Sequence, residues 1–203
     1  PVSKNIIIAN NIIVATDTEY PTHGITVDGE LRADLFTCGV IIVGNVIRYS
    51  EDAIKAVGIY IHGYPNPNYP PNIINVVVVG NQVYGAKNGL NIVNSRLVSV
   101  SNNAFHDTDR ECMVMSIAKE CSIVGNMIYR PSRTGAGGYS AILIKDYSEK
   151  NTIAYNRIYD PDSYMKNGVE EDGTSDENQI IYNSIVGASS DPIAKSGAKA
   201  FQF

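Results

Sequence analysis

Short runs of β-branched residues, each ending just after an asparagine, recur along the chain. The first three copies are IIIANNII, ending at Ile13, VIIVGNVI, ending at Ile47, and VVVVGNQV, ending at Val83. The asparagine keeps its place in all seven copies, as Asn11, Asn45, Asn81, Asn103, Asn126, Asn156 and Asn183. Successive asparagines are 22 to 36 residues apart. A repeat of this length predicts a solenoid with one supersecondary unit per repeat.

A second pattern lies between these runs, in which every other residue is apolar. Its copies usually begin with glycine: GITVDG at 24–29, GIYIHG at 58–63, GLNIVN at 89–94, CMVMSI at 112–117, AILIKD at 141–146 and GVEEDG at 168–173. A period of two is typical of a strand with one buried face. Each repeat therefore predicts three strands: two flank the asparagine and one is the alternating segment. No window shows convincing helical periodicity.

Asparagine is well suited to the bend between the first two strands of each repeat. It tolerates the left-handed backbone conformation that a sharp bend requires. Stacked asparagines can also exchange amide hydrogen bonds from coil to coil, each worth roughly 0.5–1.5 kcal/mol net. We expect the main driving force to be the burial of isoleucine and valine columns inside the coils.

Composition narrows the class of protein. The 203 residues are 44% hydrophobic and 18% charged, which indicates one folded domain rather than a disordered chain. Sixteen basic and 21 acidic residues give a net charge of -5, which argues against a nucleic-acid partner or an anionic membrane surface. No apolar run approaches the roughly 20 residues of a membrane span, so no membrane insertion is expected. Cys38, Cys112 and Cys121 lack zinc-ligand spacing and are expected to be small buried hydrophobes.

The combined pattern resembles the right-handed parallel β-helix of the pectin-lyase-like superfamily. In that family the three strands of a coil are called PB1, PB2 and PB3, and an asparagine marks the tight PB2–PB3 bend. The resemblance covers residues 5–187 and implies an all-β solenoid of about seven coils with an asparagine ladder. We expect the β-helix to occupy residues 1–187, and residues 188–203 to form a C-terminal cap or the lead-in to a further domain.

The family also implies where ligands bind, along the outer face of PB1. Alternation places Asp28, His62, Tyr60, Asn91 and Lys145 on that face. Equivalent residues of neighbouring coils lie about 4.8 Å apart, so Asp28 and His62 are expected to be adjacent, with Tyr60 beside them. This trio combines a carboxylate, an imidazole and a ring on which a sugar can stack. A solvated outer ladder without a ligand is the alternative interpretation.

A second candidate group precedes the fourth PB1 strand, in the segment HDTDRE at 106–111. Asp109 and Glu111 are candidate catalytic carboxylates, and Lys145 is a candidate base beside a uronate carboxylate. Arg133 is a candidate substrate-binding residue. The carboxylates do not cluster as a calcium loop would require, so neither a metal nor another cofactor is expected. The segment is equally compatible with a plain polar turn.

A third feature is the proline-rich loop HGYPNPNYPPN at 62–72, which carries Tyr64 and Tyr69. Proline fixes φ, so the loop can present two aromatic rings at low entropic cost. It is expected to be a carbohydrate platform, a subunit contact or a rigid connector.

Three functions are compatible with these features. The first is recognition, and in some cases depolymerisation, of bacterial cell-surface polysaccharide by a phage tail-spike-like homotrimer located outside the cell or on the virion. The alternatives are a secreted polysaccharide lyase, glycoside hydrolase or epimerase acting on acidic polysaccharide, and a non-catalytic β-helical spacer. The sequence does not decide whether the protein is an enzyme.

Overall fold

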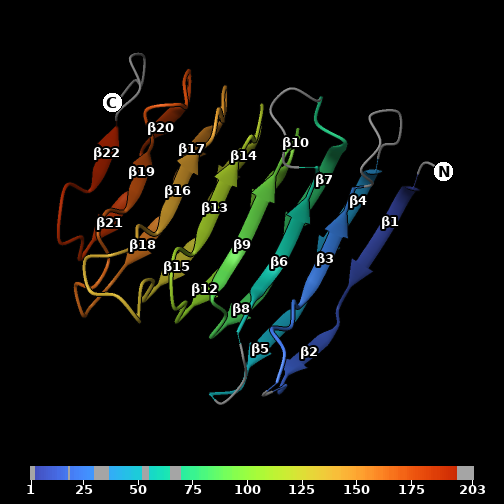
Figure 1. Cartoon of the computed structure of the whole chain (residues 1–203), viewed down its shortest axis with the longest axis horizontal. Coiled ribbons are helices and arrows are strands. Elements are labelled where there is room, and N and C mark those ends of the chain that lie inside the picture. Colours follow the sequence, from blue (N-terminus) through green and yellow to red (C-terminus); the bar gives the residue numbers. More distant parts are fainter. Residues whose placement is uncertain (1–2, 18, 30–36, 52–54, 65–69, 196–203) are drawn as a thin grey trace.

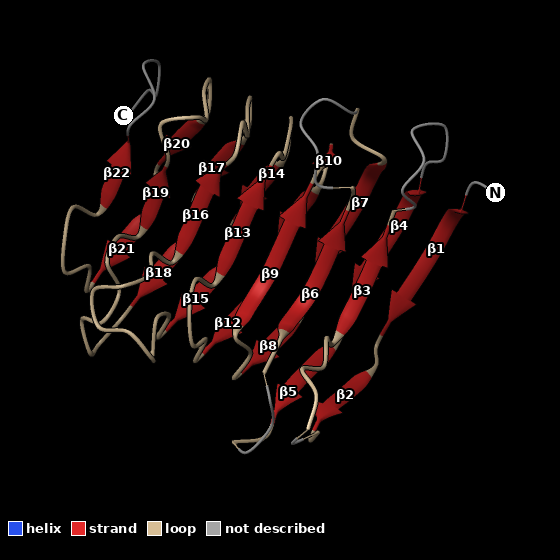
Figure 2. Ribbon diagram, viewed as in Figure 1, coloured by secondary structure: helices blue, strands red, loops and turns tan. Residues whose placement is uncertain are grey.

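A computed structural model describes residues 3–17, 19–29, 37–51, 55–64 and 70–195. These residues form 22 β-strands and no helix (Figures 1 and 2). Successive coils lie side by side in chain order, from the N-terminal coil at one end of the molecule to the C-terminal coil at the other (Figure 1). Within this part of the chain, no helical segment has the length and apolarity of a transmembrane helix.

The strands build three sheets, and neighbouring strands in each sheet pair in parallel. The PB2 sheet contains β1 (Ser3–Ala9), β4 (Thr37–Val43), β7 (Ile73–Val79), β11 (Ser99–Ser101), β14 (Ser122–Val124), β17 (Thr152–Ala154) and β20 (Gln179–Ile181), with the short β10 (Ser95–Arg96) beside β7. The PB3 sheet contains β2 (Ile12–Ala15), β5 (Val46–Tyr49), β8 (Gln82–Tyr84), β12 (Ala104–His106), β15 (Met127–Tyr129), β18 (Arg157–Tyr159) and β21 (Ser184–Val186). The PB1 sheet contains β3 (Ile25–Asp28), β6 (Val57–His62), β9 (Asn88–Val93), β13 (Met113–Ser116), β16 (Ile142–Lys145), β19 (Val169–Glu171) and β22 (Ile193–Lys195). The predicted parallel β-helix of about seven coils is confirmed.

The core is a set of apolar columns that run along the axis of the β-helix. In the PB1 sheet, Ile59 pairs with Leu90, and Leu90 with Met113, and all three side chains are buried. The alternating pattern therefore identified the inward face of this sheet correctly. Because equivalent apolar side chains stack on one another, each is removed from water. This burial stabilises the fold by roughly 25 cal/mol per Å² of apolar surface.

The seven asparagines stand in one file at the PB2–PB3 bend, as expected. Each Nδ2 donates to the Oδ1 of the asparagine in the next coil, at 2.9 Å from Asn45 to Asn81 and 3.0 Å from Asn81 to Asn103. The file is continuous from Asn11 to Asn183. These hydrogen bonds satisfy amide groups that the apolar core would otherwise leave unpaired.

The prediction that the asparagine itself adopts the left-handed conformation at the bend is wrong. The left-handed conformation belongs to the residue before each asparagine, such as Gly44 with φ of 65° or Tyr155 with φ of 55°. The asparagine itself is selected for its amide, which accepts from one coil and donates to the next. The side-chain chemistry and the backbone bend are therefore carried by adjacent residues.

A second, shorter ladder lies before the PB2 strands of the last coils and was not predicted. The backbone N–H of Cys121 donates to Asn151 Oδ1 at 2.8 Å, and Asn151 Nδ2 donates to Asn178 Oδ1 at 2.9 Å. All three residues are buried. In the fifth coil the equivalent residue is Cys121, which has no side-chain amide, so the amide-to-amide hydrogen bond joins only Asn151 and Asn178.

Glycine at the start of the PB1 strands allows close approach between coils. A Cβ atom on Gly89 would lie 2.5 Å from Phe105 Cδ1 and 2.9 Å from the carbonyl oxygen of Cys112. A side chain there would collide with the backbone of the next coil. This explains why the alternating segments so often begin with glycine.

The seventh coil closes beyond residue 187, where the sequence analysis ended the β-helix. Strand β22 pairs in parallel with β19, with Ile193 opposite Val169. Residues 196–203, the remainder of the expected cap or lead-in, lie outside the described residues.

Candidate functional site

The outer face of the PB1 sheet brings together the first predicted trio. Asp28 on β3 and His62 on β6 are paired in register, and Asp28 Oδ1 lies 3.1 Å from His62 Nδ1. Both side chains reach solvent, with 67% of Asp28 and 32% of His62 exposed. The carboxylate accepts a hydrogen bond from the protonated Nδ1, which leaves Nε2 of the neutral ring as an acceptor. His62 is therefore held in the tautomer of a base.

Tyr60 lies at the centre of this group, between two histidines. Its ring stacks on His62 with a centroid distance of 4.8 Å and lies 5.0 Å from the ring of His23. Burial, and then the nearby charge of Asp28, raise the pKa of the Tyr60 hydroxyl, so the phenol is a proton donor at neutral pH. We call Asp28, His62, Tyr60 and His23 the PB1 cluster.

His23 has the opposite tautomer to His62. Its Nδ1 accepts a hydrogen bond from the backbone N–H of Val57 at 3.3 Å. The neutral His23 ring therefore carries its proton on Nε2 and is a donor. The PB1 cluster thus presents one donor imidazole and one acceptor imidazole on either side of a phenol. The sequence analysis missed His23 because it lies just before β3, where strand alternation no longer defines a face.

Asn91 extends the cluster into the third coil. It pairs in register with Tyr60. Its Oδ1 atom is shielded from solvent and has no hydrogen-bond partner among the described residues. An unpaired buried acceptor is costly, about 1–3 kcal/mol, unless a ligand hydroxyl or a water donates to it. Because protein atoms cover this oxygen, the Asn91 side chain would have to shift before a sugar on this face could donate to it.

The predicted catalytic lysine lies far from this cluster. Lys145 is three coils away from His62 along the same file of the sheet, or roughly 14 Å at about 4.8 Å per coil. Its ammonium group lies 3.1 Å from Asp146 Oδ2, and Ser116 Oγ donates to that same oxygen at 2.8 Å. Val93 and Ser116 lie between His62 and Lys145 in this file. The structure therefore does not place Lys145 in one site with Asp28 and His62.

Of the second predicted group, Asp109 lines a pocket at the entrance to the PB1 strands. The pocket has a volume of about 300 Å³ and is lined by Glu51, Lys55, Lys87, Asp109, Arg110 and Thr134. Asp109 Oδ1 lies 3.3 Å from Lys55 Nζ, and both side chains are mostly buried. We call this hollow the basic pocket. The sequence analysis identified Asp109 but missed the two lysines.

Glu111 and Arg133 do not line this pocket. Glu111 Oε2 accepts a hydrogen bond at 3.2 Å from Asn88 Nδ2, which also donates to the Glu111 carbonyl at 2.8 Å. Arg133 is exposed, and its backbone N–H donates to Thr108. Asp109 and Glu111 therefore face different surroundings, whereas a glycosidase pair would flank one bond.

Of the two tyrosines in the proline-rich loop, the structure describes one. The backbone N–H of Tyr64 donates to Asn72 Oδ1 at 3.2 Å, and the Tyr64 carbonyl accepts from Asn94 Nδ2. These bonds fix the start of the loop beside the end of β6. Tyr69 lies outside the described residues.

An unexpected row of rings runs along the outer face of the PB3 sheet. His106 stacks on Tyr84 at a centroid distance of 4.8 Å, and its other neighbour, Tyr129, lies 6.0 Å away. Burial lowers the pKa of His106, with the charge of Asp107 opposing the shift. The rings of Tyr84 and His106 are nearly parallel and cover one face of each other, whereas the ring of Tyr129 is tilted by 52° to that of His106.

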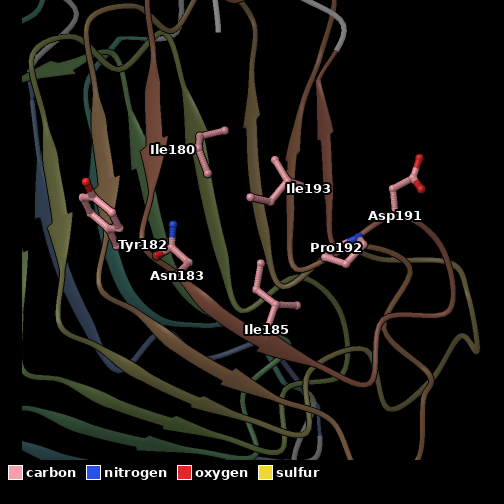
Figure 3. A pocket seen from close by; sticks show the side chains of 7 residues that line it. All are labelled: Ile180, Tyr182, Asn183, Ile185, Asp191, Pro192 and Ile193. Atoms are coloured by element: carbon pink, nitrogen blue, oxygen red, sulfur yellow. The ribbon is translucent and has the colours of Figure 1, made fainter. Parts of the chain in front are cut away.

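A larger cavity, of about 520 Å³, lies at the seventh coil (Figure 3). Ile180, Ile185 and Ile193 line it, and all belong to the core columns or pack against them. It is therefore the interior of the β-helix seen at its last described coil. Tyr182, Asn183, Asp191 and Pro192 complete its lining.

Comparisons with known proteins agree with this fold. The family model described as "Periplasmic copper-binding protein (NosD)" matches residues 3–198. The A-module of the Azotobacter vinelandii mannuronan C-5 epimerase AlgE6 superimposes with a TM-score of 0.75 at 14% identity, covering all of this chain and 55% of that one. The AlgE4 A-module from the same organism gives 0.64 at 12% identity, covering 100% and 58%. The chain thus spans little more than half the length of these structures.

A tailspike domain of bacteriophage CBA120 gives a TM-score of 0.49 at 12% identity, covering 98% of this chain and 35% of that one, which is too weak a likeness to argue from. No curated protein matches the chain.

The copper named in the family description does not fit the described residues. They contain no group of three histidine, cysteine, aspartate or glutamate side chains that could hold a metal ion. Two cysteines are buried, and burial raises the pKa of Cys121 to about 12 and that of Cys112 well above its usual value. Neither is a thiolate at neutral pH, whereas copper binding needs deprotonated ligands.

Proposed function

Because this chain belongs to the NosD family of periplasmic proteins, we propose that it acts in the cell envelope and binds acidic polysaccharide along the outer face of its PB1 sheet. The PB1 cluster is its reactive centre. The observation that carries the proposal is the pairing of Asp28 with His62 at 3.1 Å, with Tyr60 stacked on the imidazole. The similarity to two mannuronan C-5 epimerase modules supports an enzyme acting on uronates over a tail spike.

The chemistry follows from the protonation states in the cluster. Nε2 of His62 is the base that removes the C5 proton of a uronate, and the electron pair moves into the sugar carboxylate. Tyr60 is the proton donor, and the Nε2–H of the neighbouring His23 ring can donate a hydrogen bond. A proton returned to C5 from the opposite side gives the epimer, whereas loss of the O4 substituent with a proton gives an unsaturated uronate. Asp28 positions His62 and stabilises the imidazolium that forms.

The test is activity on polyuronates, with the third histidine as a matched control. Purified protein is incubated with polymannuronate and polygalacturonate in D₂O. Deuterium at C5 is read by NMR, and unsaturated product by absorbance near 235 nm. We expect His62→Gln to lose at least about 100-fold in rate, as typical for loss of a general base, and His106→Gln to keep the wild-type rate.

The reading is refuted if wild-type protein neither exchanges the C5 proton nor binds any polyuronate. Equal rates for His62→Gln and His106→Gln would refute the assignment of the base. The homotrimer expected from the sequence remains a prediction, and the mass of the protein in solution tests it.

A further inference from the structure

The basic pocket is built by four successive coils and is held rigidly by their backbones. The N–H of Lys87 donates to the carbonyl of Ala56 at 2.9 Å, and the N–H of Arg110 donates to the carbonyl of Lys87 at 2.9 Å. Thr134 continues the series, with its N–H and its hydroxyl both donating to the carbonyl of Asp109. The side chains therefore converge because the coils stack, although the residues span more than 80 positions in the sequence.

Positive charge is in excess in this pocket. Three cations and two carboxylates line it. Lys55 is paired with Asp109, whereas Lys87 and Arg110 have no carboxylate within ion-pair distance among the described residues. The pocket is therefore a local positive site on a chain whose net charge is -5. Such a concave excess of charge attracts anions.

Arg110 and Lys87, the two unpaired cations, can each bind a carboxylate in a different way. The guanidinium of Arg110 lies over the ring of Tyr139, 5.4 Å from its centroid, which restrains the guanidinium. A restrained guanidinium can grip a carboxylate through two parallel hydrogen bonds, and Lys87 adds a point charge from the neighbouring coil.

The pocket is connected to the PB1 cluster through the second coil. The backbone of Lys55 forms a parallel β-bridge with that of Thr22, the residue before His23. Lys55 and Tyr60 are five residues apart along nearly extended backbone, or roughly 16 Å. A short oligosaccharide can span that distance and place one uronate at the cluster and another at the pocket.

We propose that the basic pocket is a carboxylate-binding subsite, in which Lys87 and Arg110 bind the carboxylate of a uronic acid residue that lies further along the same polymer than the one at the PB1 cluster. This inference rests on the proposed function for the identity of the ligand. If the subsite binds in this way, the protein selects its polymer by the negative charge of the sugar residues as well as by the shape of their rings.

The experiment compares binding of an oligogalacturonate with that of its neutral methyl ester by calorimetry, with inorganic phosphate as a third probe. The double variant K87Q/R110Q is compared with K150Q/R157Q, which removes the same charges from exposed positions elsewhere. We expect K87Q/R110Q to bind the oligogalacturonate at least about tenfold more weakly, and K150Q/R157Q to bind like wild type. Neither variant should change affinity for the ester, and thermal unfolding verifies that both fold.

The outcomes separate the two proposals. Equal oligogalacturonate affinities for the two double variants overturn the subsite while leaving the proposed function standing. Wild-type protein that binds phosphate but no saccharide overturns both the carboxylate assignment and the polysaccharide function. Wild-type protein that prefers the acid to the ester, with the preference lost only in K87Q/R110Q, supports the subsite.

Discussion

Replacing Asn103 by alanine tests whether the asparagine file stabilises the coils. Asn103 is buried in the fourth coil, and its Oδ1 accepts from the backbone N–H of Asn81 at 2.9 Å and from Asn81 Nδ2 at 3.0 Å. Its Nδ2 lies within hydrogen-bond distance of Asn126 Oδ1 and of two backbone carbonyls. One amide has two N–H hydrogens, so the side chain contributes four hydrogen bonds at most.

At roughly 1 kcal/mol for each buried hydrogen bond, Asn103→Ala should lower the free energy of unfolding by about 4 kcal/mol. For a chain of this size that corresponds to a fall in Tm of about 8–16 °C. The control is Asn11→Ala, the same change at the exposed end of the file, where the side chain only donates. We expect that change to cost no more than about 1 kcal/mol.

Urea unfolding followed by far-UV circular dichroism, together with Tm, measures both variants. The reasoning fails if Asn103→Ala destabilises the protein no more than Asn11→Ala does. It also fails if Asn103→Leu restores the stability that Asn103→Ala loses, because a larger apolar side chain refills the space but still leaves the N–H of Asn81 without an acceptor.

Two further changes probe the backbone and the PB3 face. Gly89→Ala should lower the free energy of unfolding by about 2–3 kcal/mol, because the added methyl group overpacks against the next coil. Gly80→Asn should leave it nearly unchanged, because asparagine tolerates the left-handed conformation that Gly80 has. The midpoints of urea unfolding measure both changes. His106 has a lowered pKa in the folded state, so its contribution to stability is present above the unfolded pKa near 6.5 and is lost as the pH falls through the folded pKa. His106→Gln should therefore flatten the fall in Tm between pH 7 and pH 5, and an unchanged slope would contradict the assignment.

The sequence predicts the strands and the asparagine file because both follow from short, repeated spacings. Asp28 and His62 occupy equivalent positions in their strands, so counting residues was enough to place them together. The basic pocket could not be found in that way. Its residues lie in connections of different lengths between PB3 and PB1 strands, where equivalent positions are not defined by counting. Lys55 and Lys87 become neighbours only once the coils are stacked.

The one-way hydrogen bonding between successive asparagines makes the single coil a transferable module. Each asparagine between the two ends of the file accepts from the asparagine of the coil before and donates to that of the coil after, so a segment cut from just after one asparagine through the next carries both a donor and an acceptor. Removing residues 104–126 would join Asn103 to a partner of the same kind at Asn156. Whole turns could therefore be gained or lost with the remaining turns still in register, whereas a partial turn would shift every later column.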